Sequence, residues 1–221
     1  MVINAEQQRA SLNQTGLEML NLCTSQLEKA TEALKNHDSD LAEEVMNGET
    51  RVNALDLKIE RDCEKFLALY NPVAIDLRFI MAIRKINLDL ERMGDIAYEI
   101  SNYVVDEDKK IPASLFKALS FDKMYETLTS MLEDITVAYE ENDVKISRKV
   151  FKKGKALNKI NAKAFDILEA EIKKDNEIIK QALLLFVVVK KLERVGGLIK
   201  NIAEEIIFYI DAEVLKHKKK K

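Results

Sequence analysis

Apolar residues recur in steps of three and four along most of the chain, which is the period of an amphipathic helix with one buried face. In the first half this pattern breaks twice. Residues 36–40 contain Asp and Ser side chains suited to capping a helix, and Asn71 and Pro72 form the second break. Pro is tolerated in the first turn of a helix, so Pro72 is expected at the start of a third helix. The first half is therefore predicted to form three helices.

The same pattern then returns. The apolar positions of the second predicted helix recur 105 residues later, and those of the third recur 102 residues later. The word LERMGD at 90–95 returns as LERVGG at 192–197. Residues 106–114, DEDKKIPAS, are the most linker-like stretch between the two copies. We predict an all-α fold, a tandem repeat of two antiparallel three-helix bundles with six long helices.

The predicted boundaries place the first three-helix repeat at 1–108, the second at 113–216 and a basic tail at 217–221. The difference between the two offsets predicts a shorter join between the fifth and sixth helices. With only six Gly and two Pro among 221 residues, composition also favours helices.

Composition excludes several classes of protein. The longest apolar run, residues 182–189, is too short to span a bilayer, and the N-terminus lacks the pattern of a secretory signal, so a soluble protein is expected. Cys23 and Cys63 lie in apolar stripes and are expected to be reduced, buried thiols. The only histidines, His37 and His217, fall outside the predicted helices, so a Glu-x-x-His di-iron site cannot form. No catalytic triad, glycine-rich phosphate loop or zinc pattern is present, and the chain is predicted not to be an enzyme.

The charge is unevenly distributed. The net charge is −3, and removing the five lysines of residues 216–221 would leave −8. An acidic body argues against nucleic acid as the main partner. The lysine tail could make a weak contact with an anionic membrane surface or an acidic partner, or it could be a solvated terminus.

Acidic residues form a candidate metal site. Glu91 and Asp95 are four residues apart and so share a helix face. In an antiparallel hairpin, residues that lie opposite each other have numbers that sum to about twice the position of the turn. With a turn near residue 71, Glu49 and Asn53 therefore lie within one helical turn of the position opposite Glu91. Such oxygen ligands suit a hard cation such as Mg, Mn, Ca or ferric iron. The alternative is a solvated acidic face, paired with Arg92, that binds no metal.

The second copy has lost most of these ligands. The same geometry groups Gly154, Asn158, Glu193 and Gly197, a set with one carboxylate. A tight metal site in the second half is therefore not expected.

Three stretches resemble the PhoU family of phosphate-uptake regulators: NPVAIDLRFI at 71–80, LERMGDIA at 90–97, and LERVGG at 192–197 followed by NIAEEIIFYI at 201–210. The resemblance covers nearly the whole chain. It implies a cytoplasmic homodimer of two three-helix bundles. It also implies Fe, Mn, Mg or Zn held by E/D-x-x-x-D pairs, and the ligand candidates it carries over are Glu49, Glu91, Asp95 and Glu193. Asn53 stands where the family has an acid, which predicts a divergent member with depleted metal motifs.

The resemblance further implies a non-enzymatic regulator. It would act by contact with the ATPase subunit of a phosphate ABC transporter and with a sensor histidine kinase. The alternative function is a structural adaptor without metal, such as a spectrin-like rod, although the linker at 106–114 interrupts the continuous helix of such rods.

Overall fold

The structure is a computed structural model that describes residues 4–215. Its long helices are α1 (Ala5–Asn36), α2 (Ser39–Tyr70), α3 (Ala74–Asp106), α5 (Phe121–Glu141), α6 (Val144–Lys174) and α7 (Ile179–Asp211). Two short elements accompany them, α4 (Ala113–Ala118) and the 3-10 helix η1 (Asn176–Ile178). The described residues contain no strand, so the all-α prediction is confirmed. The predicted basic tail, 217–221, lies outside the described residues.

Equivalent helices in the two halves begin with equivalent caps. The Asp38 carboxylate accepts a hydrogen bond from the Leu41 amide at 3.0 Å at the start of α2. The Asp143 carboxylate does the same for the amides of Lys145 and Ile146 at the start of α6. A cap oxygen satisfies backbone N–H groups that have no partner within the helix. The two caps are 105 residues apart, as the sequence offset requires.

Two details of the predicted joins are wrong. Pro72 precedes the N-cap Val73 and lies outside α3, because Asn71 ends α2 in the left-handed conformation and the chain needs residues 71–73 to turn. The join between α6 and α7 is also not the shorter one. Residues 175–178 separate the two α-helices. The offset of 102 would start α7 at residue 176, but the 3-10 helix η1 takes the place of that first α-helical turn.

The prediction of six helices missed α4. This short helix buries Leu115 and Phe116 beside the linker, and the ring of Phe116 packs edge-on against Phe121 with centroids 5.0 Å apart. Six residues are too few to show a helical period, so the sequence pattern did not separate α4 from a loop.

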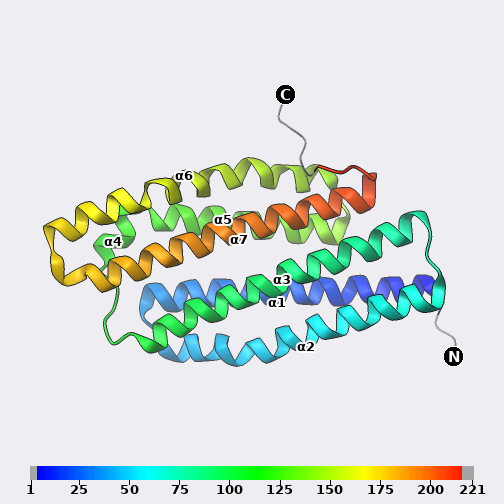
Figure 1. Cartoon of the computed structure of the whole chain (residues 1–221), viewed down its shortest axis with the longest axis horizontal. Helices are drawn as coiled ribbons and strands as arrows, with labels where there is room; N and C mark the ends of the chain where they lie inside the picture. The colour runs from blue at the N-terminus through cyan, green and yellow to red at the C-terminus, as the bar shows by residue number, and fades with distance from the viewer. Residues whose placement is uncertain (1–3, 216–221) are drawn as a thin grey trace.

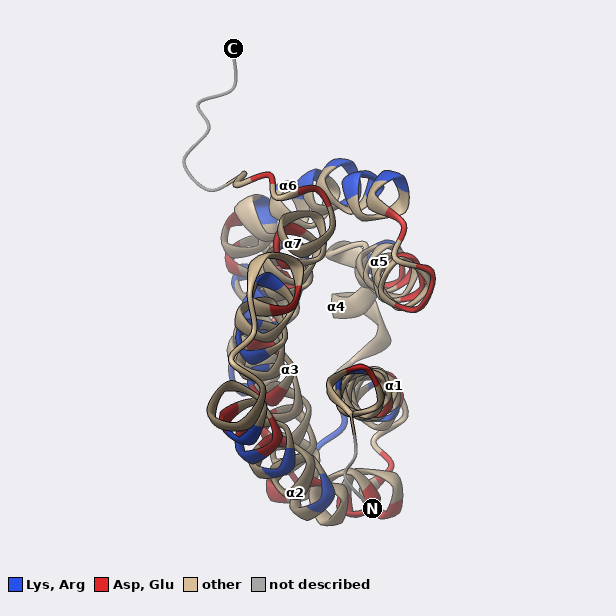
Figure 2. Ribbon diagram, turned by 90° about the vertical axis from the view of Figure 1, so that its right-hand side faces the viewer, with Lys and Arg blue, Asp and Glu red and all other residues tan. Residues whose placement is uncertain are grey.

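The six long helices form two layers. Figure 2, viewed nearly along the helices, shows α2, α3, α7 and α6 side by side in a curved layer, with α1 and α5 on one face of it. Figure 1 shows the two three-helix groups lying alongside each other, with α3 and α7 adjacent at the centre. Lys85 of α3 forms an ion pair with the buried Glu205 of α7 at 3.0 Å, which joins the halves. Because the repeats pack side by side, the rod alternative is wrong.

A close contact at a glycine recurs in both repeats. A Cβ atom at Gly94 of α3 would lie 2.9 Å from Val52 Cγ1 of α2. A Cβ atom at Gly196 of α7 would lie 2.4 Å from Leu157 Cδ1 of α6. Gly94 and Gly196 are 102 residues apart and their neighbours 105, so the two sequence offsets describe equivalent packing. The repeated glycine lets the second and third helices of each bundle approach closely.

Both cysteines lie in the hydrophobic core. Cys23 and Cys63 are both free and fully buried, as predicted. No helix in the described part of the chain is long and apolar enough to cross a bilayer.

Candidate functional site: an acidic ledge on the first repeat

The hairpin of α2 and α3 carries a group of polar side chains that we call the acidic ledge. Its members are Glu49, Asn53 and Asp56 of α2 and Glu91 and Asp95 of α3. Glu49, Asp56 and Glu91 are half-buried, whereas Asn53 and Asp95 are exposed. The close packing of α2 on α3 at Gly94 holds these side chains on one surface.

Electrostatics show that the predicted residues are neighbours. Burial raises the pKa of Glu49, the negative charge of Asp95 raises it further, and a hydrogen bond with the Asn53 side chain lowers it. The pKa of Glu91 is likewise raised, first by burial and then by Asp95, Asp56 and Glu49, while Arg92 opposes the shift. A carboxylate beside other carboxylates resists ionisation, so the ledge favours a proton or another cation.

Asp56 belongs to the ledge but was not among the predicted residues. Asn87 Nδ2 donates to Asp56 Oδ1 at 2.7 Å, and burial followed by Glu60 raises the pKa of Asp56. The sequence contained a usable signal. Asp56 follows the buried Leu55 by one residue, as Asn53 follows Val52, and it lies near the level of Asn87 in the hairpin.

A buried thiol lies behind the ledge. Cys23 Sγ donates to the Leu90 carbonyl oxygen at 3.2 Å, and burial, with Glu49 as the next contribution, raises the Cys23 pKa to about 12. This thiol is therefore neutral at physiological pH and is not a thiolate ligand.

The donor chemistry of the ledge fits a hard cation, since three or more carboxylates and an amide oxygen lie on one surface. Their arrangement is open, however. Within residues 4–215 no three His, Cys, Asp or Glu side chains are arranged to hold a metal ion. Binding at the ledge would therefore require side-chain rotations that bring Glu49, Glu91 and Asp95 together.

The equivalent surface of the second repeat has different chemistry. With the Asn158 amide oriented to satisfy its neighbours, Asn158 Nδ2 donates to Glu193 Oε1 at 3.1 Å and to the Gly154 carbonyl at 2.9 Å. These residues are thus adjacent, as the hairpin geometry predicted. The aliphatic stem of Lys200 occupies the space beside Gly154, with Cδ 3.1 Å from where a Cβ would stand. A lysine therefore stands close to the place where the first repeat carries Glu49.

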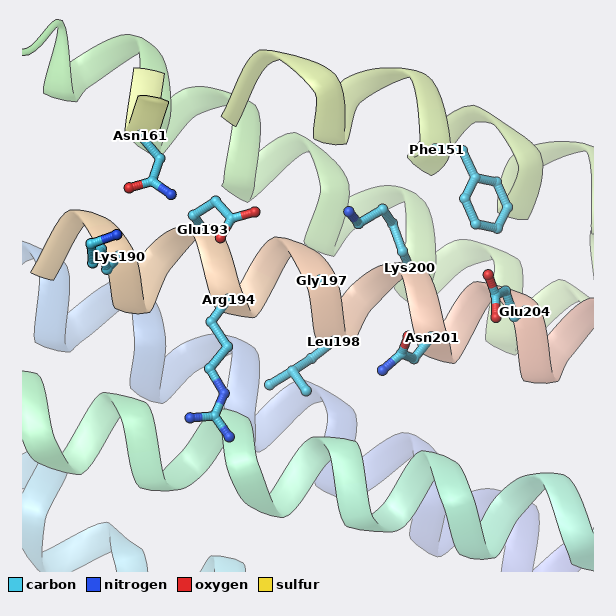
Figure 3. Close-up of a pocket in the computed structure, with 10 residues that line it drawn as sticks. All are labelled: Phe151, Asn161, Lys190, Glu193, Arg194, Gly197, Leu198, Lys200, Asn201 and Glu204. Carbon is cyan, nitrogen blue, oxygen red and sulfur yellow. The ribbon is translucent and has the colours of Figure 1, made fainter. Parts of the chain in front are cut away.

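A shallow depression of about 640 Å³ follows α7 on this side. Figure 3 shows Glu193 and Lys200 on either side of Gly197, both directed toward α6, while Arg194 points toward α3. A Cβ at Gly197 would have no atom within 4 Å, so the floor of the depression is open where the first repeat has Asp95. Glu193 is the one acid at the four predicted positions of this repeat, and it already accepts a hydrogen bond from Asn158.

Comparison with known proteins gives a consistent result. The family model described as "PhoU domain" matches twice, at residues 17–104 and 121–206. The chain is 33% identical over 201 residues to the "Phosphate-specific transport system accessory protein PhoU homolog" of Aquifex aeolicus (strain VF5), covering 91% of this chain and 90% of that protein. The corresponding protein of Escherichia coli (strain K12) is 27% identical, with 91% and 83% covered.

Solved structures agree on the fold. The crystal structure of PhoU from Pseudomonas aeruginosa has a TM-score of 0.87 at 24% identity and covers 95% of this chain and 100% of that one. The phosphate transport system regulatory protein PhoU from Streptococcus pneumoniae has a TM-score of 0.84 at 26% identity, with 96% and 100% covered. Because the family model matches both repeats and the relatives align over most of the length, the chain belongs to the PhoU family.

Proposed function

We propose that this protein is a non-enzymatic, cytoplasmic regulator of phosphate uptake and phosphate-responsive signalling. It would act by contact with the ATPase subunit of a phosphate ABC transporter and with a sensor histidine kinase. The observation that carries the proposal is the family match across both repeats, together with relatives named as accessory proteins of phosphate-specific transport. A homodimer, expected from the family resemblance, belongs to the same proposal.

The tip of the α2–α3 hairpin is the surface that best suits a protein partner. Large apolar side chains are exposed there within a short stretch: Leu69, Val73, Ile75, Leu77 and Met81. Leu69 and Val73 are 73% and 70% exposed, which leaves apolar area in contact with water. Clustered exposed apolar residues commonly mark sites of protein association. The tip also contains the segment 71–80 on which the family resemblance rests.

A pull-down with the transporter ATPase from the same organism tests this proposal. We expect the wild-type chain to retain the ATPase and the double variant Leu69→Asp/Val73→Asp to lose it. Leu57→Asp is the matched control, because Leu57 is also exposed on α2 but lies about 20 Å from the tip along the helix axis. Retention of the ATPase by the tip variant would refute the tip as the contact, and no retention by the wild-type chain would refute the partner.

We further propose that the acidic ledge binds one divalent or trivalent cation weakly, through Glu49, Glu91 and Asp95, with Asn53 as a supporting oxygen. The raised pKa values of Glu49 and Glu91 support this, because a bound cation would relieve the repulsion that causes them. When bound, Fe, Mn, Mg or Zn would supply charge neutralisation between α2 and α3. The second repeat, with Glu193 alone, is not expected to contribute a second ion.

Elemental analysis of protein purified without chelator or metal resin tests the metal proposal. We expect less than one full metal cluster per chain. We also expect added Mn²⁺ to raise the melting temperature of the wild-type chain but not that of the Asp95→Asn variant. Metal bound at full occupancy in both halves, or a Mn²⁺ response unchanged in Asp95→Asn, would contradict it.

A further inference from the structure

The outward face of α6 carries a stripe of positive charge. We define this basic stripe as the nine exposed cations Lys145, Arg148, Lys149, Lys152, Lys155, Lys159, Lys163, Lys173 and Lys174. At 100° per residue, all nine fall within an arc of about 120° around the helix axis. At 1.5 Å per residue the stripe is about 44 Å long. The seven cations from Lys145 to Lys163 form one line along α6, and the exposed Asp166, which lies in the same arc, separates them from Lys173 and Lys174 near the C-terminal end.

The stripe is exceptional within this molecule. Helix α6 contains ten Lys and Arg against three Asp and Glu, a net charge of +7, whereas the whole chain has a net charge of −3. The rest of the chain therefore has a net charge of −10. Figure 2 shows Lys and Arg gathered on α6, at one edge of the curved helical layer. The basic character attributed above to the tail alone thus extends over a whole helix.

The fold does not require these cations. The first repeat builds the equivalent helix, α2, with the same N-cap and the same packing. Subtracting the offset of 105 gives the equivalent positions of the stripe: Asp40, Glu43, Glu44, Asn47, Thr50, Ala54, Lys58, Ala68 and Leu69. This set holds one cation and three acids. Since two helices with the same structural role differ so strongly in charge, the difference calls for a role outside folding.

Most of the stripe has no internal counter-charge. Arg148 pairs with Glu213, Lys173 with Glu169 and Lys174 with Glu171. The other six cations are Lys145, which precedes Arg148, and the five lysines between Arg148 and Lys173, and none of the six forms an ion pair within residues 4–215. The side chains of these six lysines are exposed to water and are available to an external anion.

A residue near the end of the described chain lies beside the stripe. Glu213, which pairs with Arg148, lies three residues before the segment 216–221 and its five lysines.

We propose that the basic stripe of α6 is a docking surface for an anionic membrane, which goes beyond the proposed contact with the ATPase. Eight of the nine cations are lysines, which act as point charges on a diffuse anionic surface rather than as bidentate ligands for single phosphates. No aromatic residue lies within the arc, so the surface lacks the stacking groups typical of single-stranded nucleic-acid sites. A straight line of charge on an outer edge fits a flat bilayer, and the acidic first repeat then lies toward the opposite edge of the helical layer.

Vesicle sedimentation tests the proposal without any transporter component. The full chain is mixed with vesicles of phosphatidylglycerol and phosphatidylcholine, or of phosphatidylcholine alone. We expect binding to the anionic vesicles only, weakening as salt is raised. Each lysine near such a surface contributes about fivefold to binding. The variant Lys149→Gln/Lys152→Gln/Lys159→Gln/Lys163→Gln is therefore expected to bind several hundred times more weakly.

Three controls keep the result interpretable. The variant Lys65→Gln/Lys109→Gln/Lys110→Gln/Lys123→Gln makes the same change in net charge away from α6 and should bind nearly as the wild type does. A chain ending at Leu215 should keep the stripe-dependent part of the binding, and circular dichroism checks that each variant is folded.

Equal losses in the two quadruple variants, or no binding to anionic vesicles, would overturn the proposal. So would a chain that ignores vesicles but binds polyglutamate, because the stripe would then serve an acidic protein. Failure of the ATPase pull-down would leave the vesicle result unaffected, so the two proposals can fail separately.

Discussion

Adjacent glycines on α7 should respond in opposite ways to the same substitution. Gly196 faces α6, where a Cβ would lie 2.4 Å from Leu157 Cδ1, whereas a Cβ on Gly197 would have nothing within 4 Å. Both residues lie well inside the helix, so replacing either with Ala brings the same gain in intrinsic helix stability. The difference between Gly196→Ala and Gly197→Ala therefore isolates the packing of α7 on α6.

The magnitude follows from two opposing effects. Ala is favoured over Gly inside a helix by about 1 kcal/mol. For Gly197→Ala this gain stands alone, and the melting temperature should rise by roughly 2–4 °C. For Gly196→Ala, Leu157 must move within a core where it is 1% exposed, and overpacking of this kind costs about 1–3 kcal/mol. The net effect is a loss of about 1 kcal/mol, so the two variants should differ by about 2 kcal/mol.

Urea unfolding followed by far-ultraviolet circular dichroism measures this difference as a shift in midpoint at constant slope. We expect the midpoint to rise for Gly197→Ala and to fall for Gly196→Ala. If both variants were stabilised equally, Leu157 would not be packed against the α7 backbone, and the close approach of α6 and α7 would be refuted.

Three further predictions concern other parts of the fold. Burial and then the charge of Glu133 raise the pKa of Glu28, so the stability that Glu28 contributes is present in acid and lost as pH rises. Glu28→Gln should therefore raise the free energy of unfolding by about 0.5 kcal/mol at neutral pH but not near pH 4. Equal effects of the substitution at both pH values would exclude the raised pKa as the cause. Asp143→Ala removes the cap that serves two amides at the start of α6, which should lower the unfolding free energy by about 1 kcal/mol, and an unchanged urea midpoint would mean that the cap is not formed. Cys23 and Cys63 are fully buried with pKa values raised to about 12, so neither should react with Ellman's reagent until denaturant is added, and rapid reaction in the native state would contradict their burial.

Much of the candidate site was predictable because a hairpin obeys simple geometry. Glu91 and Asp95 share a face because of the helical period. Because opposite residues of a hairpin lie at equal distances from its turn, Glu49 and Asn53 were expected beside them. The same rule correctly joined Asn158 to Glu193. Asp56 was overlooked because it lies a turn closer to the tip than the residues first considered. The basic stripe was also present in the sequence, but net charge conceals it, since only the helical phase shows that the nine cations share one face.

The sequence by itself determined the helices, their caps, the duplication and which face of each helix is apolar. These properties depend on neighbours a few residues apart, and the period of 3.6 residues reveals them directly. The tertiary structure alone decided that α3 packs against α7, that Lys200 fills the space beside Gly154, and that α4 and η1 form. An apolar stripe states that a face must be buried but not which other face will bury it, because many partners with similar stripes satisfy the same hydrophobic requirement.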